Sequence, residues 1–200
     1  MKKVSLLIGA LLILSTVAFG QPLTQADRER AAKYLEQTRD GVVSAAKGLS
    51  ETQMKFKAAP DRWSVAETLE HIALAEDLIL QNVTDKIMKA PAGAADRDAA
   101  KTDAMVLAMV PDRSHKAQAP PELVPTGRWT PVETLDRFLK SRAKTIAFLE
   151  STPDLREHVA ESPLGQPMDA YEWMLFIAAH SERHTKQILE AKADPNFPKN

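Results

Sequence analysis

Two histidines, His180 and His184, are spaced so that both could bind one metal ion. A separation of four residues places their imidazoles on one face of a helix, one turn apart. Trp173, Phe176 and Ile177 continue this face, so we expect it to point into the protein. Two adjacent buried imidazoles are costly unless their polar atoms are paired, and a metal ion accepts one lone pair from each ring. The alternative is a pair of partly exposed histidines at the edge of the fold.

A third histidine, His71, lies on another apolar helix face, because Leu74, Ala75 and Leu78 follow it at helical spacing. The three imidazoles would lie at a similar depth if the helices of His71 and His180 began at the same end of a bundle. Three histidine ligands leave one coordination position open, which is typical of catalytic metal sites. This pattern makes His71, His180 and His184 the candidate metal ligands.

The other titratable side chains considered indicate no further metal ligand or catalytic group. His115 and His158 fall in polar, loop-like sequence, where solvated surface histidines are expected. Glu172 is placed to cap a helix, and Glu182 lies off the face of His180, so we expect it to be solvated. The His-Glu-x-x-His motif of zinc proteases is absent from the sequence, so no general base is assigned.

The composition is typical of a soluble globular chain and restricts the chemistry. Of 200 residues, 44% are hydrophobic and 26% are charged. Lys and Arg number 26 against 27 Asp and Glu, so no basic surplus indicates a nucleic-acid partner. The chain contains no cysteine, which excludes disulfides and thiolate nucleophiles. Any metal ion must therefore be held by histidine or carboxylate side chains.

The first twenty residues have the three-part layout of a secretory signal peptide. Lys2 and Lys3 form a basic start, residues 4–17 are almost wholly apolar, and Ala18 and Gly20 are small residues before the expected cleavage site. The apolar run is shorter than the roughly 20 residues of a membrane-spanning helix. We therefore expect a signal peptide over 1–20, one domain over 21–200, and a periplasmic or secreted protein with no stable membrane anchor after cleavage. The alternative is an uncleaved N-terminal anchor.

Four long amphipathic helices are expected, at about residues 24–47, 64–88, 130–150 and 169–191. Each begins at a polar residue that is followed three positions later by Asp or Glu, a signature of helix starts. These polar residues are Thr24, Ser64, Thr130 and Asp169. The long connection over 90–128 is expected to contain a short helix at 98–109, and 153–168 is expected to be a loop. The pattern predicts an all-α protein, a four-helix bundle with a long crossover between its second and third long helices.

Two motifs in these helices resemble those of the DinB-like superfamily, the damage-inducible helical-bundle family that includes YfiT-like metal-dependent hydrolases. The first motif is WSVAETLEH, from Trp63 to His71, and the second is DAYEW at 169–173 followed by HSERHTKQ at 180–187. The resemblance covers about residues 28–192. It implies an up-up-down-down bundle and a divalent metal ion held by His71, His180 and His184. Nickel or zinc is the first expectation for that ion, with iron or manganese as the other candidates.

The resemblance leaves three functions open. The leading hypothesis is an exported metal-dependent hydrolase that acts on an unidentified small molecule, since a metal-activated water needs no further cofactor. Family members of known activity also include isomerases and S-transferases that use thiol cofactors, and here Arg183 or Arg142 could line a thiol pocket. Export favours hydrolysis, because low-molecular-weight thiols are chiefly cytosolic. The third hypothesis is a non-catalytic binding module stabilised by its metal ion. Many members are dimeric, so a homodimer is expected, although no interface is recognisable in the sequence.

Overall fold

The computed structural model of the protein describes residues 23–199. The signal peptide expected over residues 1–20 lies outside the described residues. Within 23–199, no helix combines the length and the apolar content that crossing a membrane requires.

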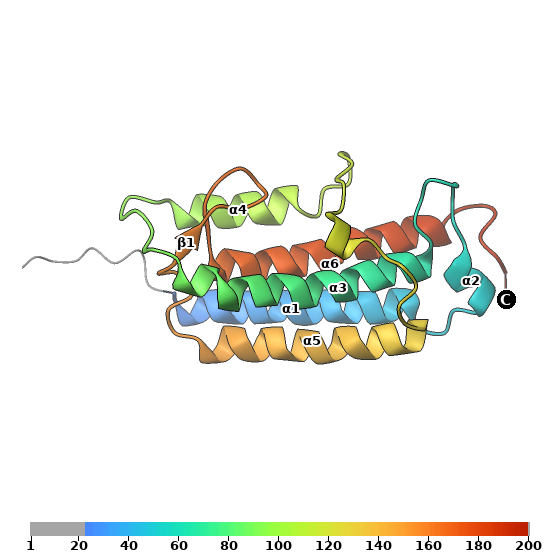
Figure 1. Ribbon diagram of the computed structural model, residues 1–200, viewed down its shortest axis with the longest axis horizontal. Helices are drawn as coiled ribbons and strands as arrows, with labels where there is room; N and C mark the ends of the chain where they lie inside the picture. The colour runs from blue at the N-terminus through green and yellow to red at the C-terminus, as the bar shows by residue number, and fades with distance from the viewer. Residues whose placement is uncertain (1–22, 200) are drawn as a thin grey trace, which may run out of the picture.

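Four long helices lie side by side and form the bundle (Figure 1). They are α1 (Gln25–Ala46), α3 (Val65–Asp85), α5 (Pro131–Ser151) and α6 (Ala170–Lys192). Each of the four helices begins with a capping box, in which the cap side chain and the side chain three residues later satisfy each other's backbone N–H groups. The predicted caps Thr24, Ser64, Thr130 and Asp169 are therefore confirmed, and the helix ends agree with the prediction to within a few residues.

Six shorter elements complete the fold over the described residues 23–199. They are α2 (Glu51–Lys55), η1 (Ile87–Lys89), α4 (Ala99–Met109), η2 (Pro121–Leu123), β1 (Val159–Ala160) and β2 (Met168–Asp169). The predicted short helix at 98–109 is confirmed as α4, with Asp98 as its cap. The antiparallel pair of β1 and β2 and the helix α2 were not predicted, because two to five residues are too few to show a periodic pattern.

The directions of the four long helices differ from the expected up-up-down-down order. The start of α1 meets the end of α5, where Arg28 donates a hydrogen bond to the carbonyl oxygen of Thr152 (2.7 Å). The starts of α1 and α6 lie together, because the Tyr171 hydroxyl donates to the carbonyl oxygen of Asp27 (2.9 Å). Their ends also lie together, where the Lys192 ammonium donates to Ala45 (2.9 Å). The observed order is therefore up-down-down-up.

This difference has a physical origin in the link between α1 and α3. Residues 47–64 reverse the chain at the end of α1, where Gly48 has a positive φ of 77° and α2 follows at once. Helix α3 therefore runs back along α1. The next connection, residues 86–130, then has to return along the length of the bundle before α5 can run parallel to α3 (Figure 1). The predicted long crossover between the second and third long helices is thus confirmed, with α4 packed on α6.

A buried arginine joins all four long helices at the centre of the bundle. The side chain of Arg142 on α5 is fully buried, and its guanidinium forms a bidentate pair with Glu76 of α3 (2.8 and 2.7 Å). Its other N–H groups donate to Leu35 and Thr38 of α1 and to Ser181 of α6. All five guanidinium N–H groups therefore have an acceptor. This pairing offsets the cost of burying a charge within an apolar core.

Candidate metal centre

The three candidate histidines converge at one point between α3 and α6. The Nε2 atom of His71 lies 3.2 Å from the Nε2 atom of His180 and 3.2 Å from that of His184. One ligand atom from each histidine lies within 4.8 Å of the others. The expectation that these residues come together is therefore confirmed.

The geometric reason for this convergence differs from the expected one. Helices α3 and α6 do not begin at the same end of the bundle but run antiparallel, since α6 runs with α1 and α3 runs against it. His71 lies in the second turn of α3, and His184 lies about two turns before the end of α6. Antiparallel packing brings these two positions to the same level.

Hydrogen bonds determine which ring nitrogens carry the protons. The Nδ1 atom of His71 lies 2.8 Å from the carbonyl oxygen of Leu123, which can only accept, so Nδ1 is the protonated nitrogen. The Nδ1 atom of His184 lies 2.9 Å from Oε1 of Gln187. Because Arg113 also donates to this oxygen (3.3 Å), it is the acceptor for His184 as well. In the neutral rings, both Nε2 atoms therefore carry lone pairs.

Two lone pairs that face each other across 3.2 Å cannot form a hydrogen bond. A metal ion between them removes this conflict. Zinc–imidazole distances of about 2.0–2.1 Å in a tetrahedral site separate neighbouring nitrogens by about 3.3 Å, close to the observed spacing. The three side chains therefore fit a divalent ion in both donor type and spacing.

The surroundings of the histidines keep the rings neutral, which is the form that binds metals. Burial lowers the pKa of His71. Burial is also the main reason why the pKa of His184 is lowered to about 3, with the charge of His71 as the next cause. The pKa of His180 is lowered well below its usual range by burial and by the charges of the other two histidines.

Aromatic rings flank the cluster on two sides. The ring of Trp63 lies 4.7 Å from that of His71, and the ring of Phe176 stacks on His180 with centroids 6.2 Å apart and an interplanar angle of 16°. His71 and His184 are 3% and 8% exposed, whereas His180 is partly exposed. Of the three histidines, His180 is therefore the most exposed.

The two arginines considered for a thiol pocket bind groups of the protein itself. Arg142 is the buried centre of the bundle described above. Arg183 donates to the carbonyl oxygens of Asp112 and of His115 (2.6 Å) in the crossover. Both guanidinium groups therefore hold the fold together in this structure.

The other sequence candidates are not members of the cluster. His115 is exposed as predicted. His158 is less solvated than expected, because its Nδ1 atom lies 2.7 Å from the carbonyl oxygen of Ala90. Glu182 is not simply solvated either, since it accepts a hydrogen bond from the Tyr34 hydroxyl (2.7 Å) and thereby joins α1 to α6.

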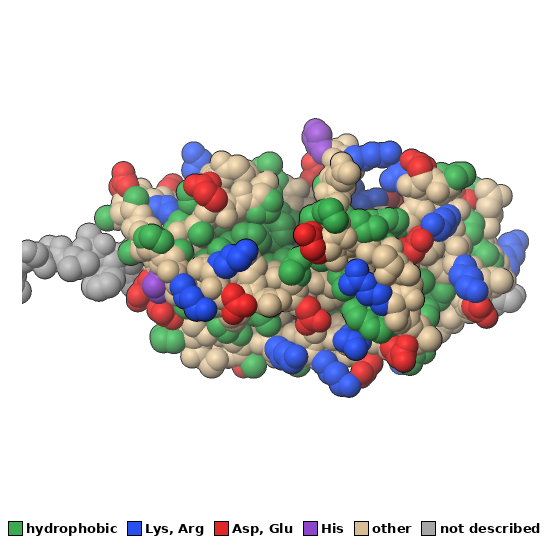
Figure 2. Space-filling view, viewed as in Figure 1, with side chains coloured by type: hydrophobic (Ala, Val, Ile, Leu, Met, Phe, Trp, Pro, Cys, Tyr) green, Lys and Arg blue, Asp and Glu red, His purple; other side chains and the backbone are tan. Residues whose placement is uncertain are grey.

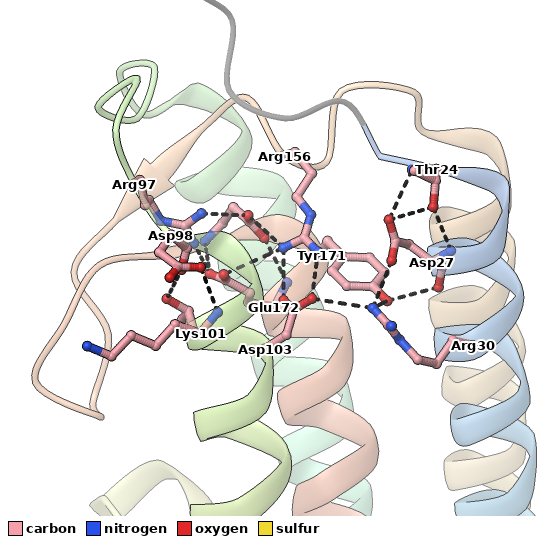
Figure 3. Close-up of polar contacts among 12 residues, drawn as sticks. Thr24, Asp27, Arg30, Arg97, Asp98, Lys101, Asp103, Arg156, Tyr171 and Glu172 are labelled. Carbon is pink, nitrogen blue, oxygen red and sulfur yellow. Dashed lines mark hydrogen bonds and ion pairs between the residues drawn. The ribbon is translucent and has the colours of Figure 1, made fainter.

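Glu172 caps α6 as predicted and also belongs to a buried cluster of charges at the start of that helix (Figure 3). Its carboxylate contacts Arg97, which comes just before α4, and lies 3.5 Å from Arg156. The same two arginines contact Asp169 (3.0 and 3.1 Å). Burial, followed by the negative charge of Asp169, raises the pKa of Glu172 to about 8. The cluster ties the start of α4 to the bundle.

This raised pKa predicts a pH-dependent stability. A carboxyl group that binds its proton more tightly in the folded than in the unfolded chain stabilises the folded state fully below its usual pKa of 4.5. This stabilisation is lost as the pH rises to about 8. We expect the free energy of unfolding of the wild type to fall relative to that of Glu172→Gln across this range, by at most about 1.4 kcal/mol per pH unit. Urea denaturation at several pH values measures the difference. Glu133→Gln, at the same capping position of α5 but on an exposed side chain, is the matched control and should leave the slope in place.

Comparisons with known proteins agree with the fold. The family model described as the DinB superfamily matches residues 34–188. The uncharacterized protein YuaE of Bacillus subtilis (strain 168) is 25% identical over 148 residues, which are 73% of this chain and 87% of YuaE. The solved structure of YfiT from Bacillus subtilis is similar with a TM-score of 0.56 at 12% identity, covering 89% of this chain and 93% of that one. YfiT is described as a probable metal-dependent hydrolase with an unusual four-helix bundle topology.

Proposed function

The chain belongs to the DinB superfamily, and from this membership and the three-histidine cluster we propose that it is a metal-dependent hydrolase. The observation that carries the proposal is the pair of facing Nε2 lone pairs on His71 and His184, which a shared cation would satisfy. The description of YfiT as a probable metal-dependent hydrolase on a similar fold supports the same reaction class.

The residues of this chain have separate roles in the proposal. His71, His180 and His184 would hold a divalent ion, with nickel or zinc as first candidates and iron or manganese next. When bound, such an ion supplies Lewis-acid chemistry, which polarises a substrate oxygen and lowers the pKa of water. The carbonyl oxygen of Leu123 and the amide oxygen of Gln187 orient two of the rings, as hydrogen-bond partners of metal ligands do.

The flanking aromatic rings of Trp63 and Phe176 would limit the access of bulk water and pack against apolar parts of the substrate. We propose a small-molecule substrate. Lys and Arg alternate with Asp and Glu over the face seen in Figure 2, which offers no basic stripe there for a nucleic acid. Export to the periplasm or the exterior, cleavage of the signal peptide and a homodimer are further parts of the proposal, and they rest on the sequence and the resemblance.

Metal content and hydrolysis together test this function. We expect the purified protein to hold about one divalent ion per chain after reconstitution with zinc or nickel, and a chelator to remove it. Reconstituted protein should hydrolyse members of a panel of ester, amide and phosphoester substrates, whereas chelated protein should not. Protein that holds no stoichiometric ion contradicts the proposed site. Thermal stabilisation by a low-molecular-weight thiol would support the S-transferase alternative, and a bound ion without any hydrolysis would support a non-catalytic role.

A further inference from the structure

The segment of residues 110–128, between α4 and α5, is anchored directly beside the three-histidine cluster. Glu70, which precedes His71 in α3, is only 2% exposed. Its carboxylate accepts hydrogen bonds from the backbone N–H groups of Thr126 (3.0 Å), Gly127 (2.8 Å) and Arg128 (3.4 Å). Gly127 has a positive φ of 72°, a conformation that lets consecutive N–H groups point at one anion. One buried carboxylate thus holds the end of this segment.

A second set of contacts anchors the beginning of the segment to α6. Arg183 donates to backbone carbonyl groups of the segment, including that of His115 (2.6 Å). Arg113 forms a bidentate pair with Glu190 (2.6 and 2.7 Å) and also donates to Gln187. Two of the residues that bind the segment, Glu70 and Arg183, are therefore direct sequence neighbours of His71 and His184.

Atoms of the same segment also orient two of the three imidazoles. The carbonyl oxygen of Leu123 accepts from Nδ1 of His71 directly. Arg113 acts on His184 through Gln187, whose Oε1 atom it holds in place for the Nδ1 proton of that histidine. If the segment moved away, His71 would lose its contact with Leu123, and Gln187, which orients His184, would lose the hydrogen bond from Arg113 that holds it in place.

We propose that docking of the 110–128 segment and metal binding are coupled, with Glu70 as a positioning residue that acts through this segment. The inference rests on the proposed function, since it requires that the three histidines bind an ion. Without an ion, the facing lone pairs of His71 and His184 repel and favour rotation of the rings, which weakens the contact with Leu123. With an ion, the rings are held and the segment is held with them. Coupling of this kind is reciprocal, so a weaker anchor must also weaken metal binding.

Zinc affinity of two matched variants tests the coupling. Glu70→Gln keeps the size of the side chain but removes its charge and turns one oxygen into an amide donor, which opposes the backbone N–H groups. We expect its Kd for Zn²⁺, measured by competition with a chromophoric chelator, to rise about 10–100-fold over the wild type. Glu122→Gln makes the same change at an exposed position of the same segment and should leave the Kd unchanged.

Hydrogen exchange of the wild type gives a second measurement that requires no variant. We expect Zn²⁺ to slow the exchange of the amides of Thr126, Gly127 and Arg128, whereas the amides at the exposed start of α5 should not respond. Equal Zn²⁺ affinity in Glu70→Gln and Glu122→Gln overturns the coupling while the metal site stands. If Glu70→Gln does not fold, exchange that is unchanged by Zn²⁺ in the wild type overturns it equally. A wild type that binds no Zn²⁺, nickel, iron or manganese overturns the proposed function and this inference together.

Discussion

Glu76→Gln is expected to lower the free energy of unfolding by about 3–5 kcal/mol, the range found when one partner of a buried ion pair is removed. The substitution leaves Arg142 charged, because a guanidinium does not lose its proton in a protein, and the side chain has no route to water. It also places an amide N–H₂ where the carboxylate accepted hydrogen bonds from Arg142 and from Thr145 (2.7 Å). Urea denaturation followed by circular dichroism measures the loss.

Two further variants distinguish this account from a general sensitivity of the core. Glu36→Gln removes a carboxylate from the exposed side of α1 and should change stability by no more than about 0.5 kcal/mol. The double variant Glu76→Leu with Arg142→Met removes both charges, and we expect it to be more stable than Glu76→Gln, because no charge is left unpaired. If Glu76→Gln lowered the free energy of unfolding by less than about 1 kcal/mol, water would have to hydrate Arg142 or the surrounding structure would have to rearrange around it, contrary to its burial.

The long helices could be predicted because their start signals are local. Thr130 and Glu133, for example, lie three residues apart and bond each other in the folded chain, so the sequence alone identifies them. Ser50 and Gln53 form the same box at α2. This capping signal alone is insufficient to predict α2, because the helix has only five residues, too few to show helical periodicity.

The helix directions could not be predicted from such signals. An extended link of the length of residues 47–64 could either cross the bundle or turn back at one end. In the structure the link turns back at the end of α1, where Gly48 and α2 lie. Compared with the expected order, that turn reverses both α3 and α6 relative to α1 and leaves them antiparallel to each other, and the three histidines therefore meet although their helices begin at opposite ends of the bundle.

The residues that orient the histidine rings could not be predicted from the sequence pattern, with one exception. Leu123 is 52 residues from His71, and Arg113 is 74 residues from Gln187, in a connection without amphipathic periodicity. Only Gln187 carried a usable signal, because it follows His184 by three residues and therefore lies on the same helix face. Side-chain types at helical spacing can indicate metal ligands, whereas the tautomers depend on long-range contacts.

His184→Ala is expected to abolish the stabilisation of the protein by a divalent ion. An ion that binds only the folded chain stabilises it by about 2.7 kcal/mol when its concentration is a hundred times its Kd. Removing one of three ligands should weaken binding by more than the roughly 10–100-fold that follows from loss of a supporting hydrogen bond. We therefore expect Zn²⁺ or Ni²⁺ to raise the Tm of the wild type and to leave that of His184→Ala unchanged.

For each variant, the Tm of the metal-loaded form is compared with that of the metal-free form. The destabilisation caused by the cavity that the imidazole leaves is present in both forms and cancels in this difference. His115→Ala is the matched control, because it removes the same side chain from an exposed loop and should keep the full metal-induced rise in Tm. Metal content by mass spectrometry of the dialysed proteins gives an independent measurement. A rise in Tm that is equal in His184→Ala and the wild type would place the ion elsewhere. The facing lone pairs of His71 and His184 would then need another partner, such as a proton shared between the rings.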